Sequence, residues 1–279
     1  MTNTVASGEH PVGVAPGDLT ILVNSTEGYA DCWEPFFTLF EAYWPGCRHE
    51  IVLNTETTDY THPRLNVRSS RTWPDPSAPR PTWGESMQRC LEGISAPVVL
   101  YLQEDYFLNA PVLAAEVERF ARIMIDEKRP HVLLRELGGH RYDPLAEHPE
   151  LWRIPGRSAY LVSLQAGLWL RSSLLELLRP AENPWQFERR GTLRARRAGM
   201  EFLCPDLERW EWAGSPVIPY EPTGIVRGRW FAPAVVDLFA AHGLAVDFSK
   251  RGFYEVDCRE RAVRTARAWA RKVAMRVLP

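Results

Sequence analysis

The chain has 279 residues, of which 45% are hydrophobic and 24% are charged, and its formal net charge is −2 at pH 7. This composition excludes wholesale disorder, and the length is sufficient for one large core or for one core with a small appendage. The near-neutral charge gives no general reason to expect a nucleic acid as partner.

The N-terminal segment and the cysteines indicate where the protein resides. Residues 1–17 are polar and lack the basic and apolar regions of a signal peptide, so we expect a loose tail. The five scattered cysteines have no zinc-type spacing and are typical of reduced intracellular thiols. No stretch approaches the roughly 20 apolar residues of a membrane span. We therefore expect a cytoplasmic protein, at most peripheral to the inner face of the membrane.

The first half of the chain alternates short apolar runs with apolar residues at helical spacing. This β-α-β alternation favours a parallel sheet with crossover helices. The expected strands are residues 19–23, 51–53, 65–67, 98–102 and 132–134, and the expected helices are residues 33–44, 83–94 and 112–128.

The second half, beyond Gly138, is less regular, and no linker separates it from the first. Pro184 is placed to open a helix. The remaining expected elements are strands at residues 159–164, 202–203 and 217–220, a short helix at residues 171–178, and a loop or hairpin at residues 224–230.

The last 21 residues, 259–279, carry seven basic residues and one acid in a helical pattern. One interpretation is a basic amphipathic helix that contacts an anionic membrane surface. The alternative, which we prefer, is a solvated helix packed on the domain, because its apolar side is rich in alanine.

The most informative segment is residues 97–107. Its apolar run, typical of a central parallel strand, ends in Gln103, Glu104 and Asp105. The carboxyl end of such a strand is where open α/β sheets bind ligands. A helix, a buried strand and then acidic residues is the arrangement expected of a nucleotide-sugar site with a divalent metal.

Several motifs, in this order, resemble a group of bacterial GT-A-type glycosyltransferase-like proteins of polysaccharide and other glycoconjugate synthesis. The matching segments are residues 24–29, 31–37, 51–56, 83–86, 101–107, 165–169 and 183–188. The resemblance implies an α/β fold of GT-A (Rossmann-like) type, with a mixed, mainly parallel sheet flanked by helices and a C-terminal elaboration. It also implies a nucleotide-sugar donor and a divalent metal.

The resemblance also suggests a domain organisation. We expect one catalytic domain over residues 18–258, between the tail 1–17 and the basic helix 259–279. Within it, residues 18–137 would form the nucleotide-sugar half and residues 138–258 the acceptor half.

GT-A enzymes commonly hold Mg²⁺ or Mn²⁺ with an Asp-x-Asp pair that follows a strand. If the strand register persists, Gln103 and Asp105 point to one side and Glu104 to the other, although a turn would bring Glu104 inward. An amide thus replaces the first carboxylate, which leaves metal dependence open and makes Asp105 the candidate ligand. The alternative is that both acids cap the next helix.

The donor nucleoside is expected against the loops that follow the first two strands. Short polar side chains at Asn24, Ser25 and Thr26 can bond base and ribose, although ordinary turn chemistry also explains them. Glu56 is a ribose acceptor or a loop acid.

The helix before the acidic strand offers three further donor-binding candidates. Ser86 and Arg89 lie near its start, where they could bind phosphate. The alternative is that this helix is simply capped and that Arg89 is solvated. Trp83 stacks on the base or packs in the core.

An inverting transfer needs a carboxylate that takes the acceptor proton, and our candidate is Glu188, beside Trp185 and Phe187. The alternative is a surface helix in which Arg189 and Arg190 pair with Glu188.

We expect a sugar to move from a nucleotide-diphosphate donor to a hydroxyl of a glycan, a lipid-linked intermediate or a small metabolite. One alternative is a nucleotidyltransferase, which would usually carry a Gly-rich phosphate loop after the first strand. The other is a non-catalytic carbohydrate-binding or assembly protein of the same fold, which Gln103 favours.

Overall fold

The computed structural model describes residues 13–135 and 142–255. The chain divides into two compact units, residues 1–222 and 223–279. The expected helix over residues 259–279 and most of the expected tail lie outside the described residues. In the described part of the chain, no helix combines the length and the apolar character needed to cross a membrane.

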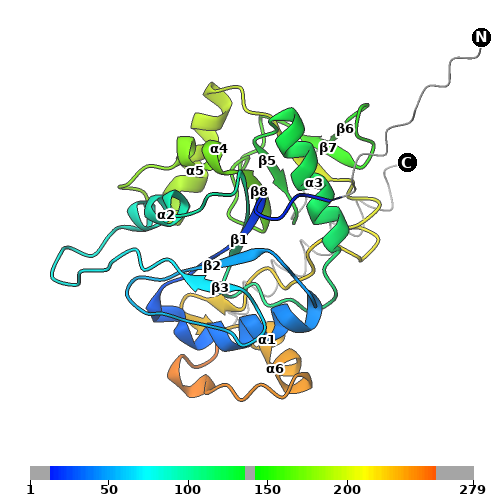
Figure 1. Cartoon of the computed structure of the whole chain (residues 1–279). Helices are drawn as coiled ribbons and strands as arrows, with labels where there is room; N and C mark the ends of the chain where they lie inside the picture. The colour runs from blue at the N-terminus through cyan, green and yellow to red at the C-terminus, as the bar shows by residue number, and fades with distance from the viewer. Residues whose placement is uncertain (1–12, 136–141, 256–279) are drawn as a thin grey trace, which may run out of the picture. The chain divides into compact units, whose positions relative to one another are not determined.

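The first unit is built on a nine-stranded sheet of order β3-β2-β1-β4-β8-β5-β9-β7-β6 (Figure 1). Strands β8 and β7 run antiparallel to their neighbours, whereas β3, β2, β1 and β4 are mutually parallel, as are β5 and β9. The bounds are β1 Leu19–Asn24, β2 Glu50–Asn54, β3 Val67–Ser69, β4 Val98–Gln103, β5 His131–Leu133, β6 Asp143–Pro144, β7 Leu151–Ile154, β8 Gly167–Leu170 and β9 Phe202–Pro205. The expected fold class, a mixed and mostly parallel sheet with flanking helices, is confirmed.

Strand β4 is central, as its continuous apolar run predicts. All of its residues from Val98 to Leu102 are buried, and it pairs in parallel with β1. Its other neighbour, β8, is antiparallel. The expectation of a central parallel strand therefore holds on the β1 side only, because an apolar run reports burial on both faces and not the direction of the neighbours.

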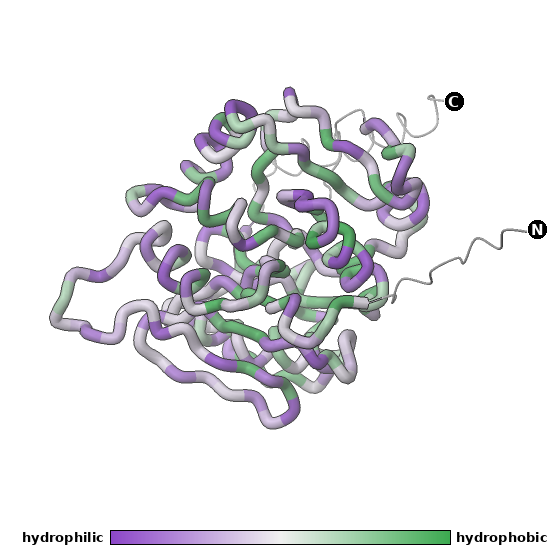
Figure 2. Tube along the Cα trace, turned by 45° about the horizontal axis from the view of Figure 1, so that its top comes forward, coloured by the Kyte–Doolittle hydropathy of each residue, from purple (hydrophilic) through white to green (hydrophobic). Residues whose placement is uncertain are grey.

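Helices cover the sheet. Their bounds are α1 Trp33–Tyr43, α2 Trp83–Glu92, α3 Ala114–Glu127, α4 Arg171–Leu177 and α5 Pro184–Arg197, with a 3-10 helix η1 at Glu27–Cys32. Apolar residues of α2, α4 and α5 form one core cluster with Leu22, Val99 and Trp169 of the sheet. Along the Cα trace, the hydrophobic stretches lie mainly in the interior and the hydrophilic stretches mainly at the outer turns (Figure 2).

Two strands expected in the second half are not formed. Residues 159–164 are irregular, and the strand follows at β8. The apolar pattern there reflects packing on α5, since the backbone N–H of Val162 donates to the Thr192 hydroxyl (3.0 Å). Residues 217–220 contribute a single bridge, between Tyr220 and Leu108. Strands β6 and β7 were not expected.

The second unit contains a hairpin, which confirms the interpretation of residues 224–230. Strands β10 (Ile225–Val226) and β11 (Arg229–Trp230) join through Arg227 and Gly228, which both have positive φ (50° and 77°). Two positive φ values are characteristic of the turn that suits tight hairpins. Helix α6 (Ala232–Ala241) and a 3-10 helix η2 (Phe248–Lys250) follow, and Phe239 and Phe248 pack edge-on against Trp230.

Candidate functional site

The candidate site lies at the carboxyl ends of β1, β2 and β4. From β1 the chain continues to β2 on one side, whereas β4 lies on the other, so the strand order reverses here. Open α/β sheets bind ligands at such a point. The last residues of the three strands are in register: Asn24 opposes Asn54 on one side and Gln103 on the other. Three side-chain amides thus stand in one row.

Asn54 joins two of these strands to α2. Its Nδ2 donates to Asn24 Oδ1 (3.0 Å) and to Ser86 Oγ (3.3 Å), while its Oδ1 accepts from Ser70 Oγ (2.8 Å). The side chain is 1% exposed. Sequence reasoning singled out Asn24 and Ser86 but missed Asn54, although the position at the end of the second strand was the available signal.

Ser25 and Thr26 lie in the turn that enters η1. The Ser25 hydroxyl accepts from Trp33 Nε1 (2.7 Å) and donates to the Thr26 carbonyl (3.3 Å), which also accepts from the Tyr29 N–H (2.9 Å). Ser25 is 4% exposed. Its hydroxyl is therefore used within the turn, and Asn24 is the residue of this trio that reaches its neighbours across the sheet.

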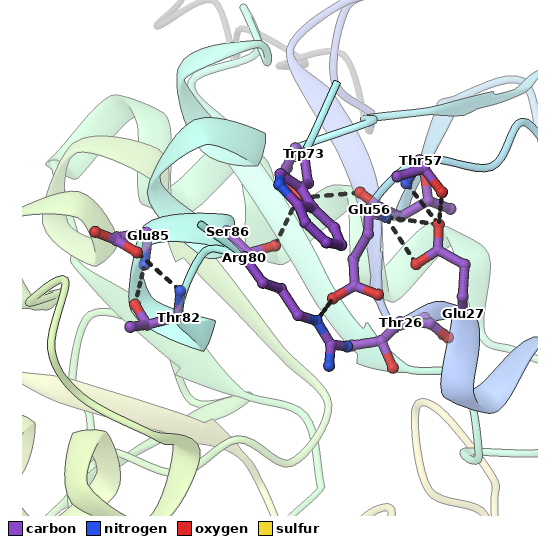
Figure 3. A network of polar contacts seen from close by, with 12 residues as sticks. Thr26, Glu27, Glu56, Thr57, Trp73, Arg80, Thr82, Glu85 and Ser86 are labelled. Carbon is purple, nitrogen blue, oxygen red and sulfur yellow. Dashed lines mark hydrogen bonds and ion pairs between the residues drawn. The ribbon is translucent and has the colours of Figure 1, made fainter. Parts of the chain in front are cut away.

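Glu27, which sequence reasoning missed, is the first residue of η1 and binds the loop after β2 (Figure 3). Its carboxylate accepts the backbone N–H groups of Glu56, Thr57 and Thr58 at 3.0, 2.6 and 2.8 Å. Burial opposes ionisation of this carboxyl group, but the hydrogen bonds outweigh burial and lower the pKa of Glu27 to about 2. The loop that carries Glu56 is thus fixed by a charged acceptor.

Glu56 stands beside this carboxylate and pairs with Arg80 (Figure 3). Burial and the neighbouring Glu27 raise the pKa of Glu56, although Arg80 opposes them. Arg80 comes from the Pro-rich loop before α2, which sequence reasoning did not connect with Glu56. The geometry brings two acids and one arginine together at the end of β2.

The start of α2 carries a capping box: the Thr82 hydroxyl accepts from the Glu85 N–H (3.1 Å), and the Glu85 carboxylate accepts from the Thr82 N–H (2.8 Å). The helix N-terminus, where we expected phosphate, thus has a carboxylate of its own. Arg89 donates to the Thr72 carbonyl (2.7 Å). Trp83 packs against Phe187 with ring centroids 5.5 Å apart.

The acidic segment forms a turn directly after β4. The Tyr106 N–H donates to the Gln103 carbonyl (3.1 Å), so the strand register ends at Gln103 and does not extend to Asp105. Glu104 and Asp105 are both buried, at 7% and 8% exposure. The helix-capping alternative is wrong, because α3 begins only at Ala114 and its N-cap is Leu113.

Glu188 reaches this turn from α5. Its Oε1 accepts from the Leu164 N–H (2.8 Å), and burial raises its pKa, opposed by that hydrogen bond. Burial is the main reason why the pKa of Tyr101 lies well above its ordinary value. The charges of Glu104, Glu188 and Asp105 raise this pKa further. All three carboxylates therefore act electrostatically on the Tyr101 hydroxyl group.

The alternative for Glu188, a pairing with Arg189 and Arg190 on a surface helix, is not seen. In the part of the chain that the structure describes, Glu188 forms no ion pair, and Arg190 instead lies 3.8 Å from Glu182. Helix α5 starts as Pro184 predicts, with Asn183 as its N-cap, and the inward side chain of Phe187 is fully buried.

Two tyrosines complete the site and were missed because they are distant in sequence. Tyr106 and Tyr220 stack with ring centroids 4.5 Å apart. The Tyr106 hydroxyl donates to the Leu164 carbonyl (2.9 Å), and the Tyr220 hydroxyl donates to Gln165 Oε1 (2.9 Å). Nothing in the spacing of the sequence signals this pair, except that Gln165 opens one of the motifs quoted above.

No group of three or more His, Cys, Asp or Glu side chains within residues 13–135 and 142–255 is placed to hold a metal ion. Glu104 and Asp105 follow β4 directly, which is where the metal ion was expected. Mg²⁺ is commonly bound through one or two carboxylates together with substrate phosphates. The residues present fit that mode and not an all-protein metal cage.

No family model matches the chain, and no curated protein matches it. Among solved structures, S. aureus TarS 1-349 in complex with UDP is similar at 14% identity and a TM-score of 0.44, over 67% of this chain and 57% of that chain. A mycobacterial protein is similar at 16% identity and a TM-score of 0.41, over 81% and 75%. A putative nucleotide-diphospho-sugar transferase from Desulfovibrio desulfuricans G20 is similar at 10% identity and a TM-score of 0.38, over 67% and 79%. The chain thus spans little more than half of the TarS fragment, and its fold class rests on its own strand order.

Proposed function

We propose that this protein is a glycosyltransferase that moves a sugar from a nucleotide-diphosphate donor to a hydroxyl acceptor. One observation carries the proposal: Glu188 and Gln103, the last residue of β4, both bind Leu164, so Glu188 lies at the strand end that Glu104 and Asp105 follow. The row of Asn24, Asn54 and Gln103 lies at the same edge of the sheet.

The donor would lie across the ends of β1, β2 and β4, with its pyrophosphate near Asp105. In this pose Asn24 and Glu56 face the nucleoside, and the loop held by Glu27 is the rigid support that positions Glu56. Ser25, Thr26, Trp83, Ser86 and Arg89 support this surface through their contacts with the chain. Phosphate contact by Arg89 remains part of the proposal.

In the transfer step Glu188 acts as the general base. As the acceptor oxygen bonds to the anomeric carbon, its proton passes to Glu188, the bond from that carbon to the phosphate oxygen breaks, and its electron pair leaves with the nucleoside diphosphate. Burial favours this role because it raises the pKa of Glu188 toward the working pH. The Leu164 N–H engages Oε1, so the second carboxylate oxygen is the one that takes the proton.

A divalent cation, Mn²⁺ or Mg²⁺, belongs to the proposal, with Asp105 as the protein ligand. The cation would neutralise the departing diphosphate. Because Gln103 supplies an amide in place of a second carboxylate, the remaining ligands would come from the pyrophosphate and water.

Calorimetry of the full chain with UDP-, GDP- and dTDP-sugars, with and without Mn²⁺, tests the proposal when it is combined with detection of released nucleotide. UDP and UDP-GlcNAc, present in the TarS complexes, are the first probes. We expect one nucleotide-sugar to bind and to be turned over when an acceptor is supplied. Binding without hydrolysis or transfer would favour the non-catalytic alternative, and preference for a nucleoside triphosphate would favour a nucleotidyltransferase.

A further inference from the structure

Helix α5 has a second face, opposite to the one that packs in the core. Its inward residues include Phe187 and Ala195, both fully buried. Outward, Trp185 is 73% exposed and Leu193 is 48% exposed. Trp185, Arg189, Leu193 and Arg197 follow one another at intervals of four residues and therefore form one stripe on the helix. Apolar and cationic side chains alternate along it.

The segment that runs alongside α5 extends this stripe. The Val162 N–H donates to the Thr192 hydroxyl (3.0 Å), and Arg196 donates to the Ser158 carbonyl (2.6 Å). Tyr160 lies between these two anchors in the sequence and is 60% exposed. Tyr160, Trp185 and Leu193 are three of the six exposed large hydrophobic residues of the described chain. We call Tyr160, Trp185, Arg189, Leu193 and Arg197 the α5 outer surface.

The arginines of this surface have no carboxylate partner among the residues that the structure describes. Arg189, Arg197 and the nearby Arg157 are exposed, and none of them makes an ion pair within the residues that the structure describes. Arg196 uses its guanidinium on the backbone carbonyls of Gly156 and Ser158, so its charge also lacks a carboxylate partner. Four arginines of α5 and the adjoining segment thus lack an ion-pair partner within the described part of the chain.

We propose that the α5 outer surface docks on an anionic phospholipid membrane. Tryptophan and tyrosine prefer the headgroup region because one part of each ring system is apolar and another forms hydrogen bonds. Arginines beside them are attracted by the negative surface potential of anionic lipids. Leu193 supplies an aliphatic side chain that can be buried at the boundary between headgroups and acyl chains. A soluble polyanion offers no such apolar environment. The proposal is independent of the transfer reaction and of the basic residues 259–276.

The test is flotation of the full chain with vesicles of phosphatidylcholine, with and without phosphatidylglycerol. We expect binding only to the anionic vesicles, weakened by salt. Trp185→Ser and the double variant Arg189→Gln/Arg197→Gln should bind less, with a loss of about fivefold for each arginine removed. The matched controls are Trp212→Ser and Arg209→Gln, which alter exposed residues elsewhere in the same unit, and these should bind like the unmodified protein.

Three outcomes would overturn the proposal. The first is no binding of the unmodified protein to anionic vesicles. The second is unchanged binding of the Trp185 and Arg189/Arg197 variants together with loss in Arg264→Gln/Arg267→Gln, which would place the contact in the C-terminal segment. The third is binding to soluble polyglutamate but not to vesicles, which would indicate an acidic macromolecule. Nucleotide-sugar calorimetry on the same variants reports separately on the proposed reaction.

Discussion

Glu188 and Gln103 bind the same residue of the chain, Leu164. Glu188 accepts the Leu164 N–H at 2.8 Å, and Gln103 Nε2 donates to the Leu164 carbonyl at 3.3 Å. The Gln103 amide donates this hydrogen bond, which an ionised carboxylate at the same position could not do. Through this link Gln103 positions the segment that holds the proposed base.

The first prediction concerns the base itself. Glu188→Gln keeps the shape of the side chain but cannot take a proton, so turnover should fall about a hundredfold or more while donor affinity stays unchanged. Because burial raises the pKa of Glu188, the acid limb of kcat/KM should lie above the ordinary range of a carboxyl group and should vanish in the variant. Steady-state kinetics across pH and calorimetry measure both. Equal loss of affinity and turnover would assign Glu188 a structural role, and Glu92→Gln on exposed surface is the control.

The second prediction separates positioning from metal binding at Gln103. Gln103→Glu removes the donor to Leu164, so turnover should fall about tenfold at every Mn²⁺ concentration, as expected for one lost hydrogen bond. Tyr106→Phe deletes the other hydrogen bond to the same carbonyl and should reproduce the effect. A gain in Mn²⁺-dependent donor affinity in Gln103→Glu would instead mean that position 103 is a ligand position occupied by an amide.

The third prediction concerns Asp105. Asp105→Asn removes the charge but not the size of the side chain, so Mn²⁺-assisted donor binding should be abolished while metal-free donor binding and the thermal unfolding midpoint are retained. Calorimetry in the presence of Mn²⁺ and in EDTA measures the difference. Unchanged donor affinity and turnover would remove Asp105 from the site.

The fourth prediction tests the close approach of α2 to the segment after α4. A Cβ atom at Gly84 would lie 2.2 Å from the Arg179 carbonyl oxygen and 2.7 Å from that of Pro180, so backbone would have to move. Gly84→Ala should lower the free energy of unfolding by about 2 kcal/mol. Gly93→Ala, at the residue that caps the end of the same helix, is the matched control, because its Cβ atom would lie 3.5 Å from its nearest neighbour. Urea unfolding compares the two, and equal stabilities would contradict the geometry.

The fifth prediction concerns His131, a fully buried residue of β5 whose two ring nitrogens have no hydrogen-bond partner. Burial lowers the pKa of His131 from 6.5 to about 3. The unfolded chain binds this proton near pH 6.5 and the folded chain does not, so stability contributed by the neutral ring is present above pH 6.5 and is lost as the pH falls toward 3.

In His131→Leu this contribution is absent. Between pH 7 and pH 5 the free energy of unfolding should therefore fall by about 2 kcal/mol less in the variant than in the unmodified protein. Urea unfolding at both pH values measures this. An identical pH dependence in both proteins would show that the ring is protonated, or bound to water, in the folded state.

The parallel half of the sheet could be predicted from the sequence because its strands are short apolar runs separated by helical patterns. Strands β1, β2, β4 and β5 and helices α1 to α4 lie where the periodicity placed them, within a few residues, and α5 begins at Pro184 as expected. The antiparallel strands could not be predicted as well. β8 follows an equally apolar segment, residues 161–164, and only packing against α5 decides which of the two pairs with the sheet.

For the site, position along a strand was the useful signal. Asn24 and Gln103 were found because they end apolar runs, and Glu188 because an acid beside aromatic residues stood out. Glu27 and Tyr220 were missed, since their roles depend on backbone N–H groups and rings that are distant in sequence. Of the two possibilities left open for the acidic segment, the structure shows the turn, because the strand ends at Gln103.

Strand β8 runs against β4 and β5, so its first residue lies at the rim where those two strands end. The Leu134 N–H donates to the Ala166 carbonyl at 2.9 Å, so the chain leaves the rim and returns to it at one point. An insertion next to this closure would change the edge of the sheet beside Leu164 while the pairing of β8 with β4 and β5 stayed intact.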